Sequence, residues 1–509
     1  MNTFMDNLTD ATNYTRTENG ALTHKSTRSD LLDLFAMGAA YRNRSDADVI
    51  NLFKNAYIEN PTYALKCLFY IRDIRGGQGE RRFFRLCMWW LAHNHQEVVK
   101  RILQFVPEFG RWDDMYIFVD TPCEEEAFQV MKKQFALDLE CKTPSLLAKW
   151  LKSENTSSKE SRKLGTLTRH YFHMTSRQYR KTLSILRERI NVLERLMSEN
   201  RWDEIEFDKI PSKAGIIYKN AFARHDLERE NADVQTYADF AKDDTKTVNT
   251  KTLYPYECVA EALKLFNVYR WGKPIANEET NRLMINKYWD NLTDYFNNAS
   301  FNGIAVVDTS GSMTGFGRPS DPINVAISLG LYCAEHNSGP FANHYISFAS
   351  QPQLIRTEGV DFCDKVERIY RTNLVDNTNI EAVFDLLLYI ALQPHTDKKD
   401  IPQNIIIISD MEFDEAVDSW RGTTGVNSKN IDTLLESIAA RWASYGLDMP
   451  GLIFWNVDAR QNNIPMIGNG RISYVSGFSP IIFETIMSGK TGYELMMEKL
   501  NSKRYDCIK

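Results

Sequence analysis

The pattern of hydrophobic and polar residues changes near residue 300. Before that point, apolar residues recur at spacings of three and four, which predicts consecutive amphipathic helices. The segments are SDLLDLFAMGAAY (29–41), DADVINLFKNAY (46–57), PTYALKCLFYIRDI (61–74), RRFFRLCMWWLAH (81–93) and QEVVKRILQFV (96–106). Because short polar or glycine-containing breaks separate them, we expect antiparallel helix pairs stacked as a HEAT-like helical-repeat solenoid, although no strict sequence period is present.

After residue 300, short β-branched runs alternate with longer amphipathic segments. The predicted strands are GIAVVD (303–308), HYISFAS (344–350), QNIIIISD (403–410) and GLIFWNV (451–457), and the helices between them are PINVAISLGLYCAEH (322–336), IEAVFDLLLYIAL (380–392) and NIDTLLESIAARWASYG (430–446). This alternation predicts a Rossmann-like α/β domain, a mostly parallel sheet with helices on both faces.

The chain is therefore divided into three parts. We expect an N-terminal extension over residues 1–28, a helical-repeat domain over 29–300 and an α/β domain over 301–509. A polar stretch at 224–252, RHDLERENADVQTYADFAKDDTKTVNTKT, is expected to be an exposed insertion or long loop.

The composition of the chain is that of a globular protein. The chain has 509 residues, of which 43% are hydrophobic and 25% charged, as in ordinary globular proteins. It contains no apolar run long enough to span a bilayer, and its polar start is unlike a signal peptide, so we expect a cytoplasmic protein. Its eight cysteines form no CxxC pair, which predicts reduced thiols and neither a zinc site nor a disulfide framework.

A polar loop follows the first predicted strand of the α/β domain. In DTSGSMTG, the carboxylate of Asp308 and the hydroxyls of Ser310 and Ser312 follow a buried strand directly, where open α/β sheets bind ligands. Such hard oxygen ligands suit Mg²⁺ or another divalent cation. The alternative is a loop of turn-forming polar residues without a ligand. A phosphate-binding P-loop is excluded because the loop has no lysine.

Two further oxygen-bearing residues are predicted at the same edge of the sheet. Asp410 ends the strand IIIISD, and Thr378 lies in a loop at the start of a helix. Asp308 and Asp410 are expected to face each other without a fixed basic partner, so their repulsion is expected to favour a bound cation.

These five residues resemble a known metal site. Asp308, Ser310 and Ser312 in DTSGSM, Thr378 in NTN and Asp410 in ISDMEF are similar, in order and separation, to the metal-ion-dependent adhesion site of von Willebrand factor A domains. The resemblance implies that the hydroxyls touch the cation, that the two aspartates act mainly through water, and that an acidic group of a partner completes the site.

An A domain behind a long helical half resembles the Ro autoantigen family, which consists of a TROVE domain followed by an A domain. LFYIRDIRGGQGERRFFR (68–85) carries a comparable RGG turn, whereas SRKLGTLTRHYFHMTSRQYRKTLSILR (161–187) and IPSKAGIIYKNAFARHD (210–226) are more similar to the uncharacterised bacterial, phage and plant relatives. The resemblance implies that the helices close into a ring whose basic hole takes single-stranded RNA ends.

A basic stretch lies within the helical half. Residues 142–195 contain thirteen lysines and arginines but four glutamates, although the whole chain has a net charge of −6. This excess is typical of a nucleic-acid site, with Tyr171, Phe172 and Tyr179 available for base stacking, but a solvated helix face is the alternative. The candidate RNA-binding residues are Lys149, Lys152, Lys159, Arg162, Lys163, Arg169, His170, Arg177, Arg180 and Lys181, together with Arg72, Arg75, Arg81 and Arg82.

Two functions follow from these patterns. The first is a Ro-like, RNA-binding ribonucleoprotein component for small structured or defective RNAs. The alternative is a metal-dependent scaffold that grips an acidic residue of a partner protein. An enzyme is not expected, because no nucleophile with a base and no nucleotide-binding loop is recognisable.

Overall fold

The computed structural model describes residues 4–20, 22–266, 277–296, 301–315, 317–372, 378–413, 431–464, 472–487 and 489–509. The chain folds into two compact units. Unit 1 contains residues 1–67 and 253–506, and unit 2 contains residues 68–252 and 507–509. Helix α4 (Pro61–Arg72) belongs partly to each unit.

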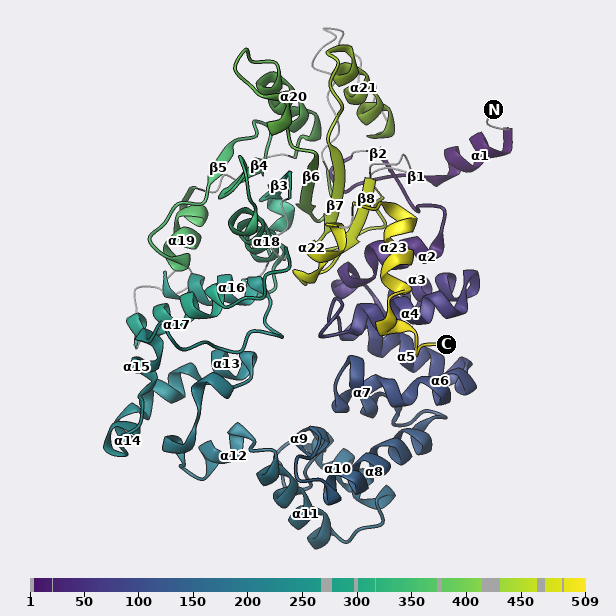
Figure 1. The fold of residues 1–509 in the computed structure, drawn as a ribbon. Coiled ribbons are helices and arrows are strands. Elements are labelled where there is room, and N and C mark those ends of the chain that lie inside the picture. The colour runs from purple at the N-terminus through teal and green to yellow at the C-terminus, as the bar shows by residue number, and fades with distance from the viewer. Residues whose placement is uncertain are drawn as a thin grey trace. The chain divides into compact units, whose positions relative to one another are not determined.

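Unit 1 is built on a mixed sheet of six described strands, in the order β5-β4-β3-β6-β7-β8 (Figure 1). β5 is antiparallel to its neighbour, whereas the other neighbouring pairs are parallel. The strands are β3 (Gly303–Asp308), β4 (His344–Phe348), β5 (Leu354–Arg356), β6 (Asn404–Ser409), β7 (Gly451–Asn456) and β8 (Ile472–Ser476). Every residue of β3, β7 and β8 is buried, so both faces of these strands are covered.

Helices from both ends of the chain cover this sheet. α18 packs against β3, β4 and β6, and α2 and α23 pack against the edge strand β8. A Cβ at Gly330 of α18 would lie 2.3 Å from Val307, so glycine permits the close approach of helix and strand. The helices of unit 1 are α1 (Phe4–Asn13), α2 (Asp30–Met37), η1 (Gly38–Asn43), α3 (Asp46–Glu59), α16 (Pro255–Leu265), α17 (Glu278–Asp290), η6 (Gly311–Met313), α18 (Pro322–His336), α19 (Phe362–Thr372), α20 (Ile380–Ala391), η7 (Lys398–Asp400), α21 (Ile431–Ser444), α22 (Ile481–Ile486), α23 (Gly492–Leu500) and η8 (Lys503–Tyr505).

Unit 2 is helical throughout its described elements. They are α5 (Arg82–Asn94), α6 (Gln96–Ile102), η2 (Leu103–Phe105), α7 (Val106–Phe109), η3 (Trp112–Phe118), α8 (Glu124–Glu140), α9 (Leu147–Trp150), α10 (Lys159–Tyr171), α11 (Ser176–Arg189), α12 (Leu193–Ser198), η4 (Trp202–Glu204), η5 (Phe207–Lys209), α13 (Ser212–Arg224), α14 (Asp226–Asn231) and α15 (Tyr237–Lys242). Helical repeats followed by a Rossmann-like sheet are the fold class that the sequence predicts, whereas ring closure stays a prediction.

The predicted exposed insertion or long loop at 224–252 is confirmed only in part, because most of its residues are exposed but it also contains two helices and several buried residues. Helices α14 and α15 form there, and Tyr237 and Phe240 are buried against Phe207. The Arg229 guanidinium is buried as well, and it donates 2.8 Å to the carbonyl of Gln235. Two aromatic residues on one helical face therefore anchor a segment whose composition is otherwise polar.

The packing units follow a different division from the predicted domains. Residues 1–67 and 253–296 pack with the sheet, although their own secondary structure is mainly helical. The predicted boundary near residue 300 separates types of secondary structure rather than packing units, and residues 297–300 themselves lie outside the described residues. The extension contains a hairpin of β1 (Tyr14–Arg16) and β2 (Leu22–His24).

All eight cysteines lie within the described residues and none forms a disulfide; six are buried, as predicted for reduced thiols. Among the described helices, none is both long and apolar enough to cross a bilayer.

Candidate metal centre and candidate nucleic-acid interface

The strand order of unit 1 creates a switch point between β3 and β6. Both strands are parallel neighbours, while β4 follows β3 on one side and β7 follows β6 on the other. In such sheets the loops diverge at the switch point and leave a crevice at the carboxyl ends of the strands. Asp308 ends β3 and Asp410 follows β6, so the topology places both carboxylates at this crevice.

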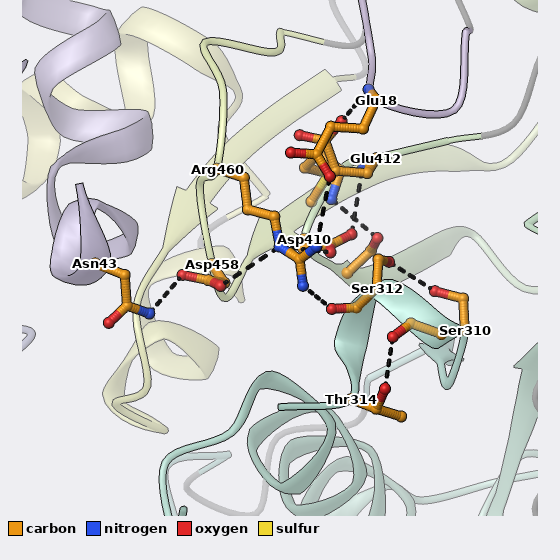
Figure 2. A network of polar contacts seen from close by, with 12 residues as sticks. Glu18, Asn43, Ser310, Ser312, Thr314, Asp410, Glu412, Asp458 and Arg460 are labelled. Carbon is orange, nitrogen blue, oxygen red and sulfur yellow. Dashed lines mark hydrogen bonds and ion pairs between the residues drawn. The ribbon is translucent and has the colours of Figure 1, made fainter. Parts of the chain in front are cut away.

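The loop after β3 is organised by Asp308. Its Oδ1 accepts a hydrogen bond from the Ser310 amide at 2.9 Å, and its Oδ2 accepts one from the Ser409 hydroxyl at 2.5 Å. The Ser310 and Ser312 hydroxyls lie 3.0 Å apart (Figure 2). A short turn, η6, then closes as the Thr314 hydroxyl donates to the carbonyl of Gly311 at 2.6 Å. The two serine hydroxyls thus lie next to each other in the loop whose backbone Asp308 holds.

Asp410 is buried at the other side of the same crevice. Its Oδ1 accepts a hydrogen bond from the Glu412 amide at 3.2 Å, and Ser312 also hydrogen-bonds to its carboxylate. Its Oδ2 is buried without a hydrogen-bond partner among the described residues. Burial, and then the charge of Asp308, raise the pKa of Asp410 to about 7. A buried, unsatisfied carboxylate oxygen is costly unless a cation or donor reaches it.

The expectation that these carboxylates lack a basic partner is wrong. Arg460 lies in the loop after β7, and its Nε is 3.8 Å from Asp410 Oδ2 and 3.9 Å from Asp458 Oδ2. Its guanidinium also donates to the carbonyl of Ser312 (Figure 2). The sequence contained a signal for this partner, because WNVDAR places Asp458 and Arg460 just after a third strand.

The N-terminal hairpin, residues 14–24, binds the loops that carry Asp410 and Arg460. The Thr17 hydroxyl donates 2.7 Å to the carbonyl of Phe413, and His24 forms a backbone bridge with Ile464. The buried Glu412 carboxylate accepts the Glu18 amide at 2.7 Å. No local pattern indicates this packing, because it joins polar segments that lie at opposite ends of the chain.

Thr378 is buried in the loop before α20. Its approach to the other four predicted metal ligands stays a prediction. The described residues contain no group of three or more His, Cys, Asp or Glu that could hold a metal ion, so a cation at the switch point would depend on the hydroxyls as well. Two carboxylates and two converging hydroxyls are oxygen donors of the kind that Mg²⁺ accepts.

The basic stretch places exposed cations on helices α10 and α11 of unit 2. Ser158 caps α10, and Thr175 with Gln178 forms a capping box on α11, so side-chain hydrogen bonds fix where both helices begin. Five cations on these two helices are exposed and have no acidic partner among the described residues; they are Lys159, Arg162, Arg177, Arg180 and Lys181. Exposed His170 lies beside Tyr171. We call this set, without the histidine, the basic face.

Other cations of the stretch are engaged within the protein. Lys163 lies 3.3 Å from Asp120, and Lys149 lies 3.6 Å from Glu194. Lys152 is 5.6 Å from the ring centroid of Tyr116. Arg169 donates to Glu154 at 2.8 Å. The first of these pairs is exposed and is therefore weak.

The aromatic residues expected to stack on bases serve the core of unit 2 instead. Phe172 and Tyr179 are buried, and Tyr171 stacks on Phe128 at 4.3 Å between ring centroids. The Tyr171 hydroxyl donates to Glu124 at 2.8 Å. The aromatic residues at the end of α10 and in α11 therefore pack within unit 2.

The arginines of the RGG turn are also largely structural. Arg72 is buried, and its guanidinium makes two hydrogen bonds to Asp114, which contradicts its prediction as an RNA-binding residue. Arg81 bonds to Asp113, and Arg75 donates 2.6 Å to the carbonyl of Glu108. Arg82 is half-buried. The sequence could not show this, because Asp113 and Asp114 lie on a separate helix.

The fold and site thus define a class of protein, in which helical repeats precede a Rossmann-like domain with an acidic, hydroxyl-rich crevice. The chain belongs to the family described as domain of unknown function DUF2828, whose model matches residues 17–143 and 137–300. A second model, domain of unknown function DUF7788, matches residues 302–506.

Among the proteins similar to this chain are a viral protein and a protein of known structure. An uncharacterized protein, L728, of Acanthamoeba polyphaga mimivirus is 28% identical over 519 residues, covering 94% of this chain and 85% of that protein. The crystal structure of the Ro (RSR) protein of Deinococcus radiodurans covers 91% of this chain and all of its own, with a TM-score of 0.39 and 13% identity. This degree of structural likeness carries no conclusion about function.

Proposed function

We propose that this protein binds RNA without catalysing a reaction, and that the basic face of α10 and α11 contacts the phosphates. The observation that carries the proposal is the exposure of five cations without acidic partners among the described residues, on two adjacent helices. Charges held in this way keep their full attraction for a polyanion, because forming a contact breaks no internal ion pair.

Hydrogen bonds between α10, α11 and the preceding segment, residues 151–154, support this role. Glu154 accepts hydrogen bonds from Arg169 at 2.8 Å and from the Ser176 hydroxyl at 2.7 Å, and so ties the two helices to the segment before them. Arg187 reaches the same segment, with 2.8 Å to the carbonyl of Leu151. The helices that carry the exposed cations are therefore held in place before RNA binds, which lowers the entropy cost of binding.

The test is a charge reversal confined to the basic face. Arg162→Glu, Arg177→Glu, Arg180→Glu and Lys181→Glu together should weaken binding to an RNA hairpin with a single-stranded tail at least tenfold at low salt. The log–log slope of affinity against salt should flatten by about three, since each lost single-strand contact removes ~0.7. Fluorescence anisotropy over a salt series measures both quantities.

The matched control reverses four exposed lysines elsewhere, Lys54, Lys398, Lys503 and Lys509. This control changes net charge equally and should bind the tailed RNA within threefold of wild type. Equal loss in both variants would show a general charge effect. Tight binding by the basic-face variant, or no binding by wild type at low salt, would exclude the basic face as an RNA site.

A second candidate function rests on the buried Oδ2 of Asp410, which has no hydrogen-bond partner among the described residues. We propose that Asp308, Ser310, Ser312, Thr378 and Asp410 hold Mg²⁺ or another divalent cation, which would supply a coordination position for an acidic residue of a partner protein. Both functions are compatible, because their residues lie in different units.

Millimolar Mg²⁺ or Mn²⁺ should raise the melting temperature of the wild-type protein, since a ligand that binds the folded state stabilises it. Asp308→Asn should abolish this rise, whereas Asp208→Asn, at an exposed position in unit 2, should leave it unchanged. Differential scanning fluorimetry with Ca²⁺-free and EDTA-treated protein measures the shift. An equal rise in the Asp308 variant would remove the metal site.

A further inference from the structure

Arg460 lies near both Asp410 of the candidate metal centre and Glu18 of the N-terminal hairpin (Figure 2). Its Nε is 3.8 Å from Asp410 Oδ2, the oxygen that has no hydrogen-bond partner among the described residues. On another side its Nη1 is 3.5 Å from Glu18 Oε2 in the hairpin. One guanidinium thus faces three carboxylates: the buried Asp410 of the site, Asp458 at 3.9 Å from Nε, and the half-exposed Glu18 of the hairpin.

The contacts of Arg460 with these carboxylates are longer than its contact with the Ser312 carbonyl, which anchors the guanidinium. The guanidinium donates to the carbonyl of Ser312, whereas its approach to Asp410 is longer than a hydrogen bond. The Arg460 side chain is 33% exposed, so it has solvent on one side. A long, flexible cation held loosely beside Asp410 can withdraw from it without breaking a hydrogen bond to that residue.

We propose that Arg460 competes with the divalent cation for Asp410, and thereby sets the metal affinity of the site. Two positive groups next to one carboxylate repel each other, most strongly where the surroundings are partly desolvated. Glu18 and Asp458 offer the guanidinium alternative partners, and through Glu18 the hairpin favours the arrangement in which the metal can bind. This inference rests on the metal-dependent candidate function and is independent of RNA binding.

The first consequence concerns the charge at position 460. Arg460→Gln removes the positive charge but retains a donor for the Ser312 carbonyl, and it should bind Mn²⁺ at least tenfold more tightly than wild type. Arg460→Lys keeps the charge and should stay within threefold of wild type. Arg356→Gln, at an exposed arginine in the same unit, is the matched control and should not change Mn²⁺ binding.

The second consequence concerns the coupling between Glu18 and Arg460. Glu18→Gln should weaken Mn²⁺ binding about threefold or more in the wild-type background, because the guanidinium loses the nearer of its two alternative partners, Glu18 and Asp458. The same substitution should have a smaller effect when Arg460 is already Gln, as a double-mutant cycle would show. Glu358→Gln removes an exposed acid elsewhere in the unit and controls for net charge.

Isothermal titration calorimetry with Mn²⁺ at fixed ionic strength measures these affinities directly, and melting in EDTA confirms that each variant is folded. Tighter binding by Arg460→Gln but not by Arg460→Lys, together with coupling to Glu18, is the expected result. Equal or weaker binding by a folded Arg460→Gln protein would overturn the inference while leaving the metal site intact. Absence of Mn²⁺ binding in every variant would overturn the metal site itself.

Discussion

Among single residues, Asp114 shows how the fold uses charge in unit 2. Its Oδ2 accepts hydrogen bonds from Arg72 Nε and Nη2 at 3.0 and 2.6 Å, and its Oδ1 accepts one from Arg85 Nε at 2.8 Å. Burial alone would raise the pKa of Asp114, but the charges and hydrogen bonds of Arg72 and Arg85 outweigh it, so its pKa lies below the ordinary value of 3.8.

Asp114→Asn should therefore destabilise the protein by about 3–5 kcal/mol at pH 7, because it leaves the buried Arg72 charge without a counterion. A lowered carboxyl pKa contributes stability that is present above the ordinary carboxyl pKa and is lost as the pH falls through the folded-state pKa. The difference between variant and wild type should thus shrink below about pH 4. Urea denaturation at neutral and at acidic pH measures it.

The control for this experiment is Asp208→Asn, at an exposed position in unit 2. It should change the free energy of unfolding by less than about 0.5 kcal/mol, as surface substitutions usually do. A similar decrease in the free energy of unfolding in both variants would mean that the buried Arg72–Asp114 pair does not stabilise the protein more than an exposed carboxylate does. The expected contrast separates Arg72, as a structural residue, from the exposed cations of the basic face.

Between elements, the packing of α10 on the segment 151–157 depends on Gly165. A Cβ at this position would lie 2.9 Å from the carbonyl oxygen of Lys152 and 2.9 Å from the carbonyl carbon of Ser153. Both are backbone atoms, which cannot move aside as a side-chain tip can. The helix therefore approaches the segment so closely that only glycine fits.

Gly165→Ala should consequently destabilise unit 2 by about 1–3 kcal/mol through overpacking, although alanine is the better helix former by ~1 kcal/mol. Ser184→Ala, at an exposed position in α11, is the matched control and should be neutral or slightly stabilising. Chemical denaturation followed by circular dichroism measures both. A stabilised Gly165→Ala protein would show that the segment moves away from the helix without cost.

Across the full chain, segments that are distant in sequence build unit 1. Residues 1–67 join 253–506, and α2 near the N-terminus packs against β8 near the C-terminus. β8 is an edge strand, yet all of its residues are buried, because α2 and α23 pack against it. Such cover protects an edge strand, whose unpaired backbone groups are otherwise a site for aggregation. The predicted division at residue 300 does not reflect this packing.

Local sequence patterns specify the type and order of the main elements and the position of the acidic crevice. Alternating β-branched runs and amphipathic segments predict the strands around Asp308 and Asp410, because these periodicities are local and each buried face repeats within a few residues. The parallel order of such strands then brings their carboxyl ends to one edge. Local composition also indicates the exposed cations of α10 and α11.

Which polar residues meet depends instead on tertiary packing. Arg460 lies near Asp410, and Arg72 forms a hydrogen-bonded ion pair with Asp114, and in both pairs the residues are far apart in sequence. Charge counts along the chain cannot distinguish a paired arginine from a free one, because pairing depends on where another element places its carboxylate. The same holds for Tyr179, whose aromatic ring is buried rather than offered to a base. Long-range packing, which no local pattern encodes, therefore decides which charges of this protein are paired and which stay exposed.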